Sequence, residues 1–412
     1  PFVRSFTKYK EKTNQDMLTH VLKELVGKYN LEGKRLGEVS MGAVMKHAGD
    51  WNLARESVLG SGLAPETPAY DLQRACGTSL SATLQLANKI ALGQIECGIA
   101  GGSDTNSDLP LELSKDLSKK FIGLTQSKSL KEKVTHISQV RPKDLLPQMP
   151  TVGEPRTGKS MGEHCEEMAK TWGITREEQD ELAYQSHHKA AEAYEKGFYD
   201  DLVTEYEGQK KDGILRPDTT AEKLAKLKTA FDKSEQGSLT AGNSTPLTDG
   251  ASCVLLASED YAKQMGWPIL AYFVDGETAA VDFVGGEGLL MAPAYAVPRL
   301  LERQKMSLQD FAFYEIHEAF AAQVLSTLKA WEDETFCREK LGLEKPLGPI
   351  ERSKLNTKGG SVALGHPFAA TGSRIVAGLS KILSEEAESG QRGLISVCTA
   401  GGMGVTAILE KA

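Results

Sequence analysis

Long hydrophobic runs are missing from this sequence. No apolar stretch among its 412 residues approaches the ~18 residues that a membrane-spanning helix needs. The chain also does not open with a positively charged segment followed by an apolar core, the pattern of a secretory signal. It starts at Pro1 rather than at a methionine, so we expect part of the natural N-terminus, including any targeting segment, to be missing. The sequence predicts a protein without a membrane-spanning helix.

Cysteine is sparse as well. The six cysteines include no C-x-x-C pair, and none belongs to a Cys/His cluster with the spacing of zinc ligands. This excludes a disulfide-stapled scaffold and a zinc-binding domain, and we expect no metal site. Isolated cysteines of this kind are usually small buried apolar residues, unless a special local setting makes them reactive. They are Cys76, Cys97, Cys165, Cys253, Cys337 and Cys398.

Positive charge is in deficit. The chain has 48 basic and 56 acidic side chains, a net charge of −8, which argues against nucleic acid as a partner. With 40% hydrophobic and 25% charged residues, the length is sufficient for a folded protein with more than one core. One stretch, residues 115–143, runs against the overall charge with eight Lys and Arg and two acidic residues. It is either a docking surface or a solvated helical face.

Helical and extended patterns alternate along the chain, which is typical of an α/β protein. Met17–Tyr29 predicts a helix and Val39–Val44 a strand. Residues 69–104 and 356–402 share one order of extended piece, glycine turn, helix, apolar run and Gly-Gly, which indicates an internal duplication. We therefore expect an N-terminal half at 1–110, completed by about 243–270, and a C-terminal half at 271–412. Between them, 111–242 is a helical insertion, in which Thr175–Glu178 is a capping box for a helix ending near Gly197.

Cys76 is the first candidate for chemistry. It precedes the predicted helix with Leu80 and Leu84 on its apolar face, and Gly77 would let a substrate approach the backbone. A cysteine at a helix N-terminus faces free N–H groups that stabilise the thiolate, the nucleophilic form. The alternative is a buried cysteine at a tight turn, and the local pattern favours neither.

Three further candidates lie in the C-terminal part. His317 and His366 are placed where strands become helices, with Pro367 at the first position of the second helix, and in open α/β sheets ligands bind at such strand ends. Cys398 ends an apolar strand and enters a glycine turn whose N–H groups suit an oxyanion hole. A structural histidine and a packed strand cysteine are the respective alternatives.

Five motifs in order give the chain a resemblance to the thiolase family. The resemblance implies the thiolase fold, two duplicated α/β halves in a layered αβαβα core with residues 111–242 as a loop domain. His317, where most thiolases have Asn, and Ala400, in place of the Gly of Cys-x-Gly, resemble the 3-ketoacyl-CoA thiolases that form the β subunit of trifunctional fatty-acid oxidation complexes. The motifs are Cys76-Gly-Thr-Ser79, Asn243-Ser-Thr-Pro-Leu-Thr-Asp-Gly250, His317-Glu-Ala-Phe320, Gly359-Gly-Ser-Val-Ala-Leu-Gly-His-Pro367 and Cys398-Thr-Ala-Gly-Gly-Met-Gly404.

The same resemblance assigns roles in an acyl transfer that cleaves 3-ketoacyl-CoA with CoA to acetyl-CoA and a shortened acyl-CoA. Cys76 would hold the acyl group as a thioester, with His366 helping to form the thiolate. Cys398 would be the general acid and base, with a thiol that titrates near the working pH. The resemblance also places His366 Nε2 at the thioester oxygen, with His317 doing what Asn does in other thiolases, directly or through a water, and the N–H groups of Cys76 and Ala400 would form a second oxyanion hole.

Coenzyme A enters as a substrate, and no tightly bound cofactor is expected. By resemblance Met161 and Thr245 line the pantetheine channel, Phe320 lies in the same region, and Lys228 lies near the adenine. The basic insertion would favour the phosphates. The expected partners are a second copy in a homodimer or tetramer, a multifunctional hydratase/dehydrogenase α subunit, and a membrane surface contacted peripherally. The bacterial cytoplasm is the expected location, with the mitochondrion as the alternative.

Three rival interpretations remain open. A biosynthetic acetoacetyl-CoA thiolase would use the same residues on short chains, although His317 and Ala400 argue against it. A ketoacyl synthase shares the duplicated fold and a Cys/His/His site, but the Gly-His-Pro367 and Cys398 motifs resemble those of thiolases. From another class, the chain would act mainly as a subunit that docks to a partner or an anionic membrane through residues 115–143.

Overall fold

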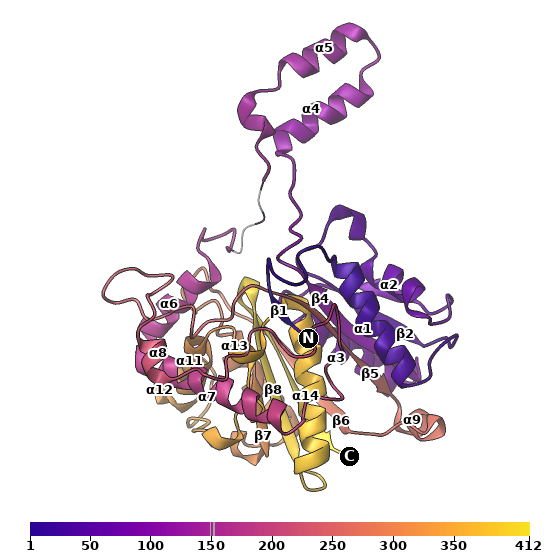
Figure 1. Cartoon of the computed structure of the whole chain (residues 1–412). Coiled ribbons are helices and arrows are strands. Elements are labelled where there is room, and N and C mark those ends of the chain that lie inside the picture. Colours follow the sequence, from indigo (N-terminus) through magenta and orange to yellow (C-terminus); the bar gives the residue numbers. More distant parts are fainter. Residues whose placement is uncertain (149, 151–152) are drawn as a thin grey trace.

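Two mixed β-sheets form the centre of the protein in a computed structural model of the chain, which describes residues 1–148, 150 and 153–412. The first sheet has the strand order β1-β5-β4-β2-β3 and the second the order β6-β9-β8-β7 (Figure 1). The strands of the first are β1 (Val3–Arg4), β2 (Glu38–Met41), β3 (Ala69–Asp71), β4 (Cys97–Asp104) and β5 (Thr248–Ala257). Those of the second are β6 (Ala271–Ala280), β7 (Phe313–Ile316), β8 (Arg392–Thr399) and β9 (Met403–Lys411).

The two sheets repeat one topology. β2 is parallel to β4, which is antiparallel to β5, which is antiparallel to β1. In the second sheet β7 is parallel to β8, which is antiparallel to β9, which is antiparallel to β6. The outer edge is similar too: β3 pairs in parallel with β2, and Leu355 forms an isolated parallel bridge with Tyr314 of β7. The predicted internal duplication is confirmed, while the exact domain boundaries stay a prediction.

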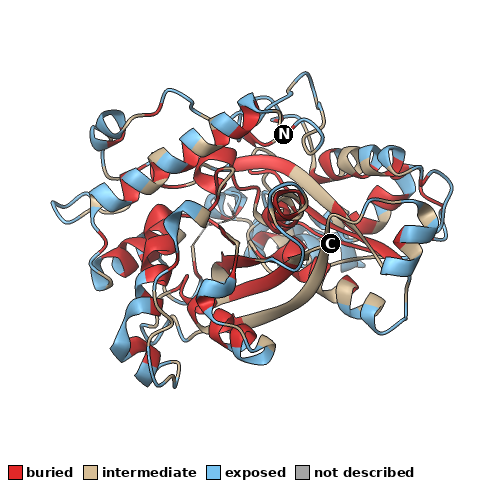
Figure 2. Ribbon diagram, turned by 90° about the horizontal axis from the view of Figure 1, so that it is seen from below, coloured by how far each residue is buried: buried red, intermediate tan, exposed pale blue. Residues whose placement is uncertain are grey.

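Helices between and outside the sheets complete five layers, the expected αβαβα order. α3 (Thr78–Ala91) and α14 (Thr371–Glu386) contact each other and strands of both sheets, so they form the middle layer. Figure 2 shows the buried residues gathered on the sheets and on the helix faces that cover them. At the crossing of the two helices, a Cβ on Gly372 would lie 2.4 Å from the backbone nitrogen of Leu80, so only glycine permits this close approach.

The outer layers follow from amphipathic patterns. α1 (Asn14–Lys28), the helix predicted at Met17–Tyr29, buries Leu18, Leu22 and Val26 against the first sheet, and α2 (Leu53–Ser61) lies beside it. α10 (Ala292–Gln304) covers the second sheet and contacts α11 (Ala321–Glu332). The shorter helices α9 (Glu259–Met265), α12 (Glu334–Glu339) and α13 (Ser361–Leu364) lie in connections.

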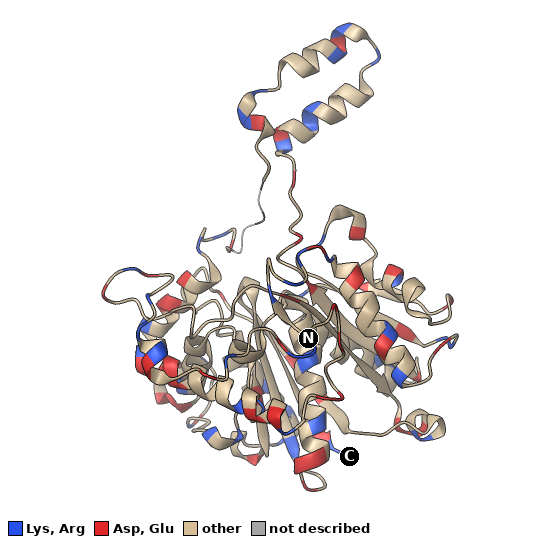
Figure 3. Cartoon of the chain, viewed as in Figure 1, with Lys and Arg blue, Asp and Glu red and all other residues tan. Residues whose placement is uncertain are grey.

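The insertion between β4 and β5 has two parts. α6 (Met161–Thr171), α7 (Arg176–Glu195) and α8 (Ala221–Ala225) pack on the body, and Thr175 caps α7 through the predicted capping box with Glu178. α4 (Lys115–Gln126) and α5 (Leu130–Ser138) instead form a hairpin that stands away from the body (Figure 1). Most of the basic residues of 115–143 lie on this hairpin (Figure 3).

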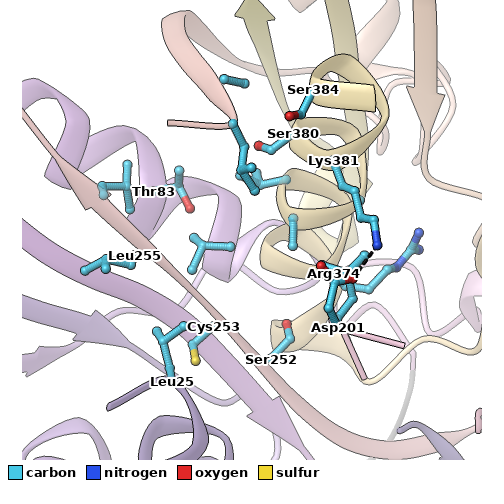
Figure 4. Close-up of a pocket in the computed structure, with 18 of the residues that line it drawn as sticks. Leu25, Thr83, Asp201, Ser252, Cys253, Leu255, Arg374, Ser380, Lys381 and Ser384 are labelled. Carbon is cyan, nitrogen blue, oxygen red and sulfur yellow. Dashed lines mark hydrogen bonds and ion pairs between the residues drawn. The ribbon is translucent and has the colours of Figure 1, made fainter. Parts of the chain in front are cut away.

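A groove of about 660 Å³ runs along β5, between α1, α14 and β6 (Figure 4). β1 pairs with only Thr248 and Asp249, so the remaining edge of β5 borders this groove. Its lining is mainly apolar, with an ion pair between Lys381 and Asp201 at one end. None of the four predicted reactive side chains lines the groove, so the groove and the candidate site are separate.

Within the described part of the chain, no helix combines the length and the apolar character needed to cross a bilayer.

Candidate active site

Cys76 lies at the start of α3, as the sequence predicts. Ala75, just before it, has a φ of 43°, a left-handed conformation that is uncommon for residues other than glycine. Gly77 follows, and a Cβ there would lie 2.8 Å from the side chain of Val405 and 2.9 Å from that of Thr399. The strained turn and the missing side chain therefore bring the cysteine of the N-terminal half against strands of the C-terminal half.

His366 contacts this cysteine directly. Its Nε2 lies 3.1 Å from Cys76 Sγ, and its Nδ1 lies 2.5 Å from Thr371 Oγ1. The backbone N–H of His366 donates to Thr248 Oγ1 at 3.1 Å. The predicted local structure is wrong here: His366 lies in a turn between two short helices, not at a strand end, and Pro367 precedes the 3₁₀ helix Phe368–Ala370 rather than opening α14.

His317 follows β7 directly, as expected, and packs beside His366. The two ring centroids are 4.1 Å apart. Nδ1 of His317 lies 2.8 Å from Ser361 Oγ, while its buried Nε2 has no hydrogen-bond partner among the described residues. A polar atom without a partner in a buried site is available for a ligand.

Cys398 and Ala400 complete the arrangement from the second sheet. Cys398 is buried in β8, and burial, followed by the electrostatic effect of nearby Cys76, raises its pKa. The N–H groups of Ala400 and of Cys76 itself act on the Cys76 thiol and lower its pKa, as oxyanion-hole donors would. The turn after Cys398 is fixed by Glu154, whose Oε1 accepts the Gly401 N–H at 2.6 Å.

Burial dominates the electrostatics of the site. It raises the pKa of Cys76 to about 12, outweighing the lowering by the two N–H groups, and it raises the pKa of Cys398 well above its usual value. Burial, followed by the charge of Arg374, lowers the pKa of His366 to about 3, and it lowers the pKa of His317 well below its usual range. Without substrate the site holds neutral thiols and neutral imidazoles. At Cys76 desolvation outweighs the stabilisation of the thiolate by the helix N-terminus, and the expectation that the Cys398 thiol titrates near the working pH stays a prediction.

Phe231, an aromatic side chain that the sequence reasoning missed, lies beside two of the residues predicted to bind coenzyme A. The ring of Phe231 lies 5.8 Å from that of Phe320 and fills the space above Gly162, next to Met161 at the start of α6. Thr245 donates its N–H to Ala319 O at 3.1 Å, beside Phe320. Lys228 is exposed, three residues before Phe231. Their roles toward coenzyme A stay predictions.

Several buried polar residues that support the site were also missed. Asp104, at the end of β4, accepts N–H groups from Met45 and Ala369, both at 2.7 Å, and so ties the N-terminal half to the turn after His366. Burial raises its pKa to about 7. Its position at the end of a predicted strand was the one sequence signal that could have indicated a place near the site. Ser361, Thr371 and Arg374 surround the two histidines, and nothing in their local sequence pattern indicates that role.

Metal binding is the remaining question for these side chains. Over the described ranges, Cys76, His317 and His366 form the one group of His, Cys, Asp or Glu residues whose ligand atoms all lie within 4.8 Å of one another. Such a set could hold a soft metal ion. The expectation that the protein uses no metal stays a prediction.

The duplicated fold and the Cys/His/His/Cys site define a class of acyl-transferring enzymes, and comparisons with known proteins agree. The profile "Thiolase, N-terminal domain" matches residues 1–260, and "Thiolase, C-terminal domain" matches residues 267–411. The chain therefore belongs to the thiolase family and is an acyltransferase.

Individual relatives show which members of the family the chain is similar to. The chain is 41% identical over 417 residues to the 3-ketoacyl-CoA thiolase of Yersinia pestis (strain Pestoides F), covering 100% of this chain and 94% of the relative. The 3-ketoacyl-CoA thiolase of Yersinia pseudotuberculosis serotype O:3 (strain YPIII) has the same identity and coverage. Among solved structures, the Bacillus anthracis acetyl-CoA acetyltransferase has a TM-score of 0.81 at 31% identity, covering 100% of this chain and 96% of that one. The Acat5 thiolase from Ascaris suum, in complex with coenzyme A, has a TM-score of 0.80 at 23% identity, with 100% and 97% covered, and so supports the fold.

Proposed function

We propose that the protein is a degradative 3-ketoacyl-CoA thiolase of fatty-acid β-oxidation, which transfers a shortened acyl group from 3-ketoacyl-CoA to CoA through Cys76. The observation that carries the proposal is the 3.1 Å contact between Cys76 Sγ and His366 Nε2, with Cys398 and the Ala400 N–H beside it. The identity of 41% to enzymes named 3-ketoacyl-CoA thiolase supports the substrate class.

The first half-reaction begins from a neutral pair. As Cys76 Sγ bonds to the 3-keto carbon, its proton moves to His366 Nε2, a base that is neutral at working pH because its pKa is lowered to about 3. The bond between C2 and C3 then breaks, the acyl group stays on Cys76 as a thioester, and the electron pair remains on C2 of the departing acetyl-CoA. Cys398 gives its proton to that carbon, which releases acetyl-CoA.

The second half-reaction uses the same groups in reverse. The Cys398 thiolate takes the proton from the thiol of an incoming CoA, and the CoA sulfur attacks the thioester carbon. The Cys76 sulfur leaves as the thiolate and regains a proton from His366. Burial, which raises the pKa of the Cys398 thiol in the empty site, makes the thiol a weaker acid for the departing carbon and its thiolate a stronger base for the CoA thiol.

Two donor sets stabilise the negative oxygens. We assign the N–H groups of Cys76 and Ala400 to one oxyanion, because both act on the Cys76 sulfur in the empty site. His317 and His366, with ring centroids 4.1 Å apart, are assigned to the other. CoA would lie along Met161, Thr245 and Phe320, with Lys228 toward the adenine.

A substrate series tests the function. Thiolysis of a short and a long 3-ketoacyl-CoA is followed by loss of the enolate absorbance, and the acyl-enzyme is trapped and located by peptide mass spectrometry. We expect activity on the long substrate and an acyl group on the Cys76 peptide. Activity confined to acetoacetyl-CoA would instead support the biosynthetic alternative, and an acyl group on Cys398 would contradict the assigned roles.

A second function, peripheral docking at an anionic membrane, is favoured by the α4–α5 hairpin. Its exposed face carries Leu130, Val134 and Ile137, with exposed fractions of 79%, 57% and 59%. The hairpin also carries exposed basic side chains, and exposed apolar and basic residues together are typical of helices that lie in a membrane interface. These basic side chains are Lys115, Lys119, Lys128, Lys131 and Lys133. Because the hairpin stands away from the body, it fits docking better than contact with coenzyme A beside Phe231 (Figure 3).

Vesicle sedimentation tests this docking. We expect binding to vesicles that contain anionic lipid, weakening with salt, and little binding to phosphatidylcholine alone. Replacing Lys128, Lys131 and Lys133 by Gln should abolish it, whereas the matched replacement of three lysines exposed on the body, Lys10, Lys210 and Lys263, should not. Binding that needs a hydratase/dehydrogenase subunit instead of lipid would assign the hairpin to a protein partner.

We also propose that the protein forms at least a dimer, and a monomer by light scattering would contradict this proposal.

A further inference from the structure

The two active-site histidines have different hydrogen-bond partners on the side away from the substrate. Nδ1 of His317 meets the hydroxyl of Ser361, and Nδ1 of His366 meets the hydroxyl of Thr371. A hydroxyl has one proton to give and can also accept, so each hydroxyl's other contact determines which way the proton points. Both hydroxyls are fully buried, where a proton without an acceptor is costly.

At His317 the second contact is a donor. Arg374 Nη2 donates to Ser361 Oγ at 2.7 Å, and a guanidinium can only donate. The Ser361 proton then has one acceptor among the described residues, His317 Nδ1 at 2.8 Å. A neutral His317 therefore carries its own proton on Nε2, the atom for which the described residues offer no partner.

At His366 the second contact is an acceptor. Thr371 Oγ1 donates to the carbonyl of Pro367 at 3.1 Å, the usual bond of a helical threonine to the residue four positions before it. The threonine oxygen then accepts the Nδ1–H of His366 at 2.5 Å. This leaves Nε2 with a lone pair toward Cys76 Sγ, so the thiol proton also has an acceptor.

We propose that Ser361, with Arg374 behind it, and Thr371 are positioning residues that fix His317 and His366 in opposite tautomers. His366 is thereby set to accept the Cys76 proton at Nε2, and His317 is set to donate its Nε2–H to the thioester oxygen. The catalytic role given to each Nε2 atom rests on the proposed function. The two tautomers rest only on the hydrogen bonds of the substrate-free site.

Neutron diffraction from deuterium-exchanged crystals of the substrate-free protein tests the tautomers without any substrate. We expect deuterium on Nε2 of His317 and on Nδ1 of His366, with Nδ1 of His317 and Nε2 of His366 bare. Deuterium on Nδ1 of His317, or on Nε2 of His366, overturns the proposal. This result does not depend on whether the protein performs thiolysis, so failure of the proposed function would be recognised separately.

Two variants separate positioning from structure through different readouts. Thr371→Val removes the acceptor behind His366 and should lower the rate of Cys76 alkylation by iodoacetamide ~10-fold or more, and Thr371→Ser should restore it. Ser361→Ala should leave alkylation within about 2-fold but lower kcat of thiolysis ~10²-fold at a similar KM, because it releases the oxyanion donor. Ser326→Ala, which removes a buried hydroxyl without a partner in the described part of the chain, is the matched control for both rates.

The pattern of losses decides the outcome. If Thr371→Val and Ser361→Ala lower alkylation and thiolysis by the same factor, or if Thr371→Ser fails to restore alkylation, the hydroxyls are merely structural and the proposal is wrong.

Discussion

The two halves of this protein share a strand order but not a chemistry. The N-terminal half contributes one of the proposed catalytic side chains, Cys76, from the strained turn that enters α3. The C-terminal half contributes His317, His366 and Cys398. The duplication thus places two sets of strand ends and turns opposite each other. The proposed catalytic role of each half depends on the residues at those positions and not on the shared fold.

The halves also differ at one sheet edge. β6 pairs with β9 from Ala271 opposite Lys411 to Ala280 opposite Met403, whereas β1 covers only Thr248 and Asp249 of β5. The rest of β5 borders the groove of Figure 4. Equal topology therefore does not guarantee equal protection of backbone hydrogen bonds.

The largest expected effect is loss of the N-terminal half's nucleophile. Cys76→Ala should lower thiolysis by ~10⁴-fold or more, because no acyl-enzyme can form. Steady-state kinetics measure the loss. Cys253→Ala, which alters a half-buried cysteine on β5 lining the groove, is the matched control and should remain active. Full activity of Cys76→Ala would contradict the proposal that the N-terminal half supplies the nucleophile.

Removing Cys398, the proposed acid of the C-terminal half, should lower thiolysis less than removing Cys76 and should leave alkylation of Cys76 intact. Cys398→Ala should lower thiolysis ~10²–10⁴-fold, because protonation of the departing carbon and deprotonation of CoA lose their catalyst. Alkylation of Cys76 by iodoacetamide should continue, since His366 is intact. If alkylation stops as well, the two cysteines do not have separate roles.

The pH dependence of Cys76 alkylation sharpens the picture of a neutral pair. The pKa of the thiol is raised to about 12 and that of His366 is lowered to about 3, so neither group titrates between about pH 5 and about pH 9. Because the thiol passes its proton to His366 in the step rather than to solvent, the rate should change by less than ~2-fold across this range. A plateau above a midpoint near neutrality would indicate a thiolate–imidazolium pair instead.

The contact between the halves can be weakened at α14. Gly372→Ala places a Cβ 2.4 Å from the backbone nitrogen of Leu80 and should lower the free energy of unfolding by ~1–3 kcal/mol. Gly378→Ala, on the same helix with nothing within 4 Å of the new Cβ, should leave it unchanged or raise it by up to ~1 kcal/mol. Chemical denaturation measures both, and equal effects would contradict the tight crossing of α3 and α14.

The smallest effect concerns the open edge of β5. Between Ser252 and Ala257 the residues of β5 pair with β4 on one side only, so alternate amides should exchange hydrogen at least ~10-fold faster than their neighbours. β9, paired on both sides by β6 and β8, should be protected throughout. Hydrogen exchange resolved by residue compares them, and uniform protection of β5 would mean that another strand covers its edge.

Much of the fold could be predicted from sequence because its determinants are local. The apolar spacing of Leu18, Leu22 and Val26 predicts α1, and the capping box at Thr175 predicts the start of α7. The placement of His366 could not be predicted in this way. Its loop runs between two short helices and is held by Thr248, 118 residues earlier in the chain.

The sequence by itself determined the α/β class, the duplication and the candidate reactive residues, since periodicity and side-chain chemistry are carried by neighbouring positions. Only the tertiary structure decided their protonation states and partners. Burial raises the pKa of Cys76 against the helix N-terminus, and Arg374, Ser361 and Thr371 set the hydrogen bonds of the two histidines. Desolvation and hydrogen-bond direction depend on groups from distant segments, and these meet only when the two halves have packed together.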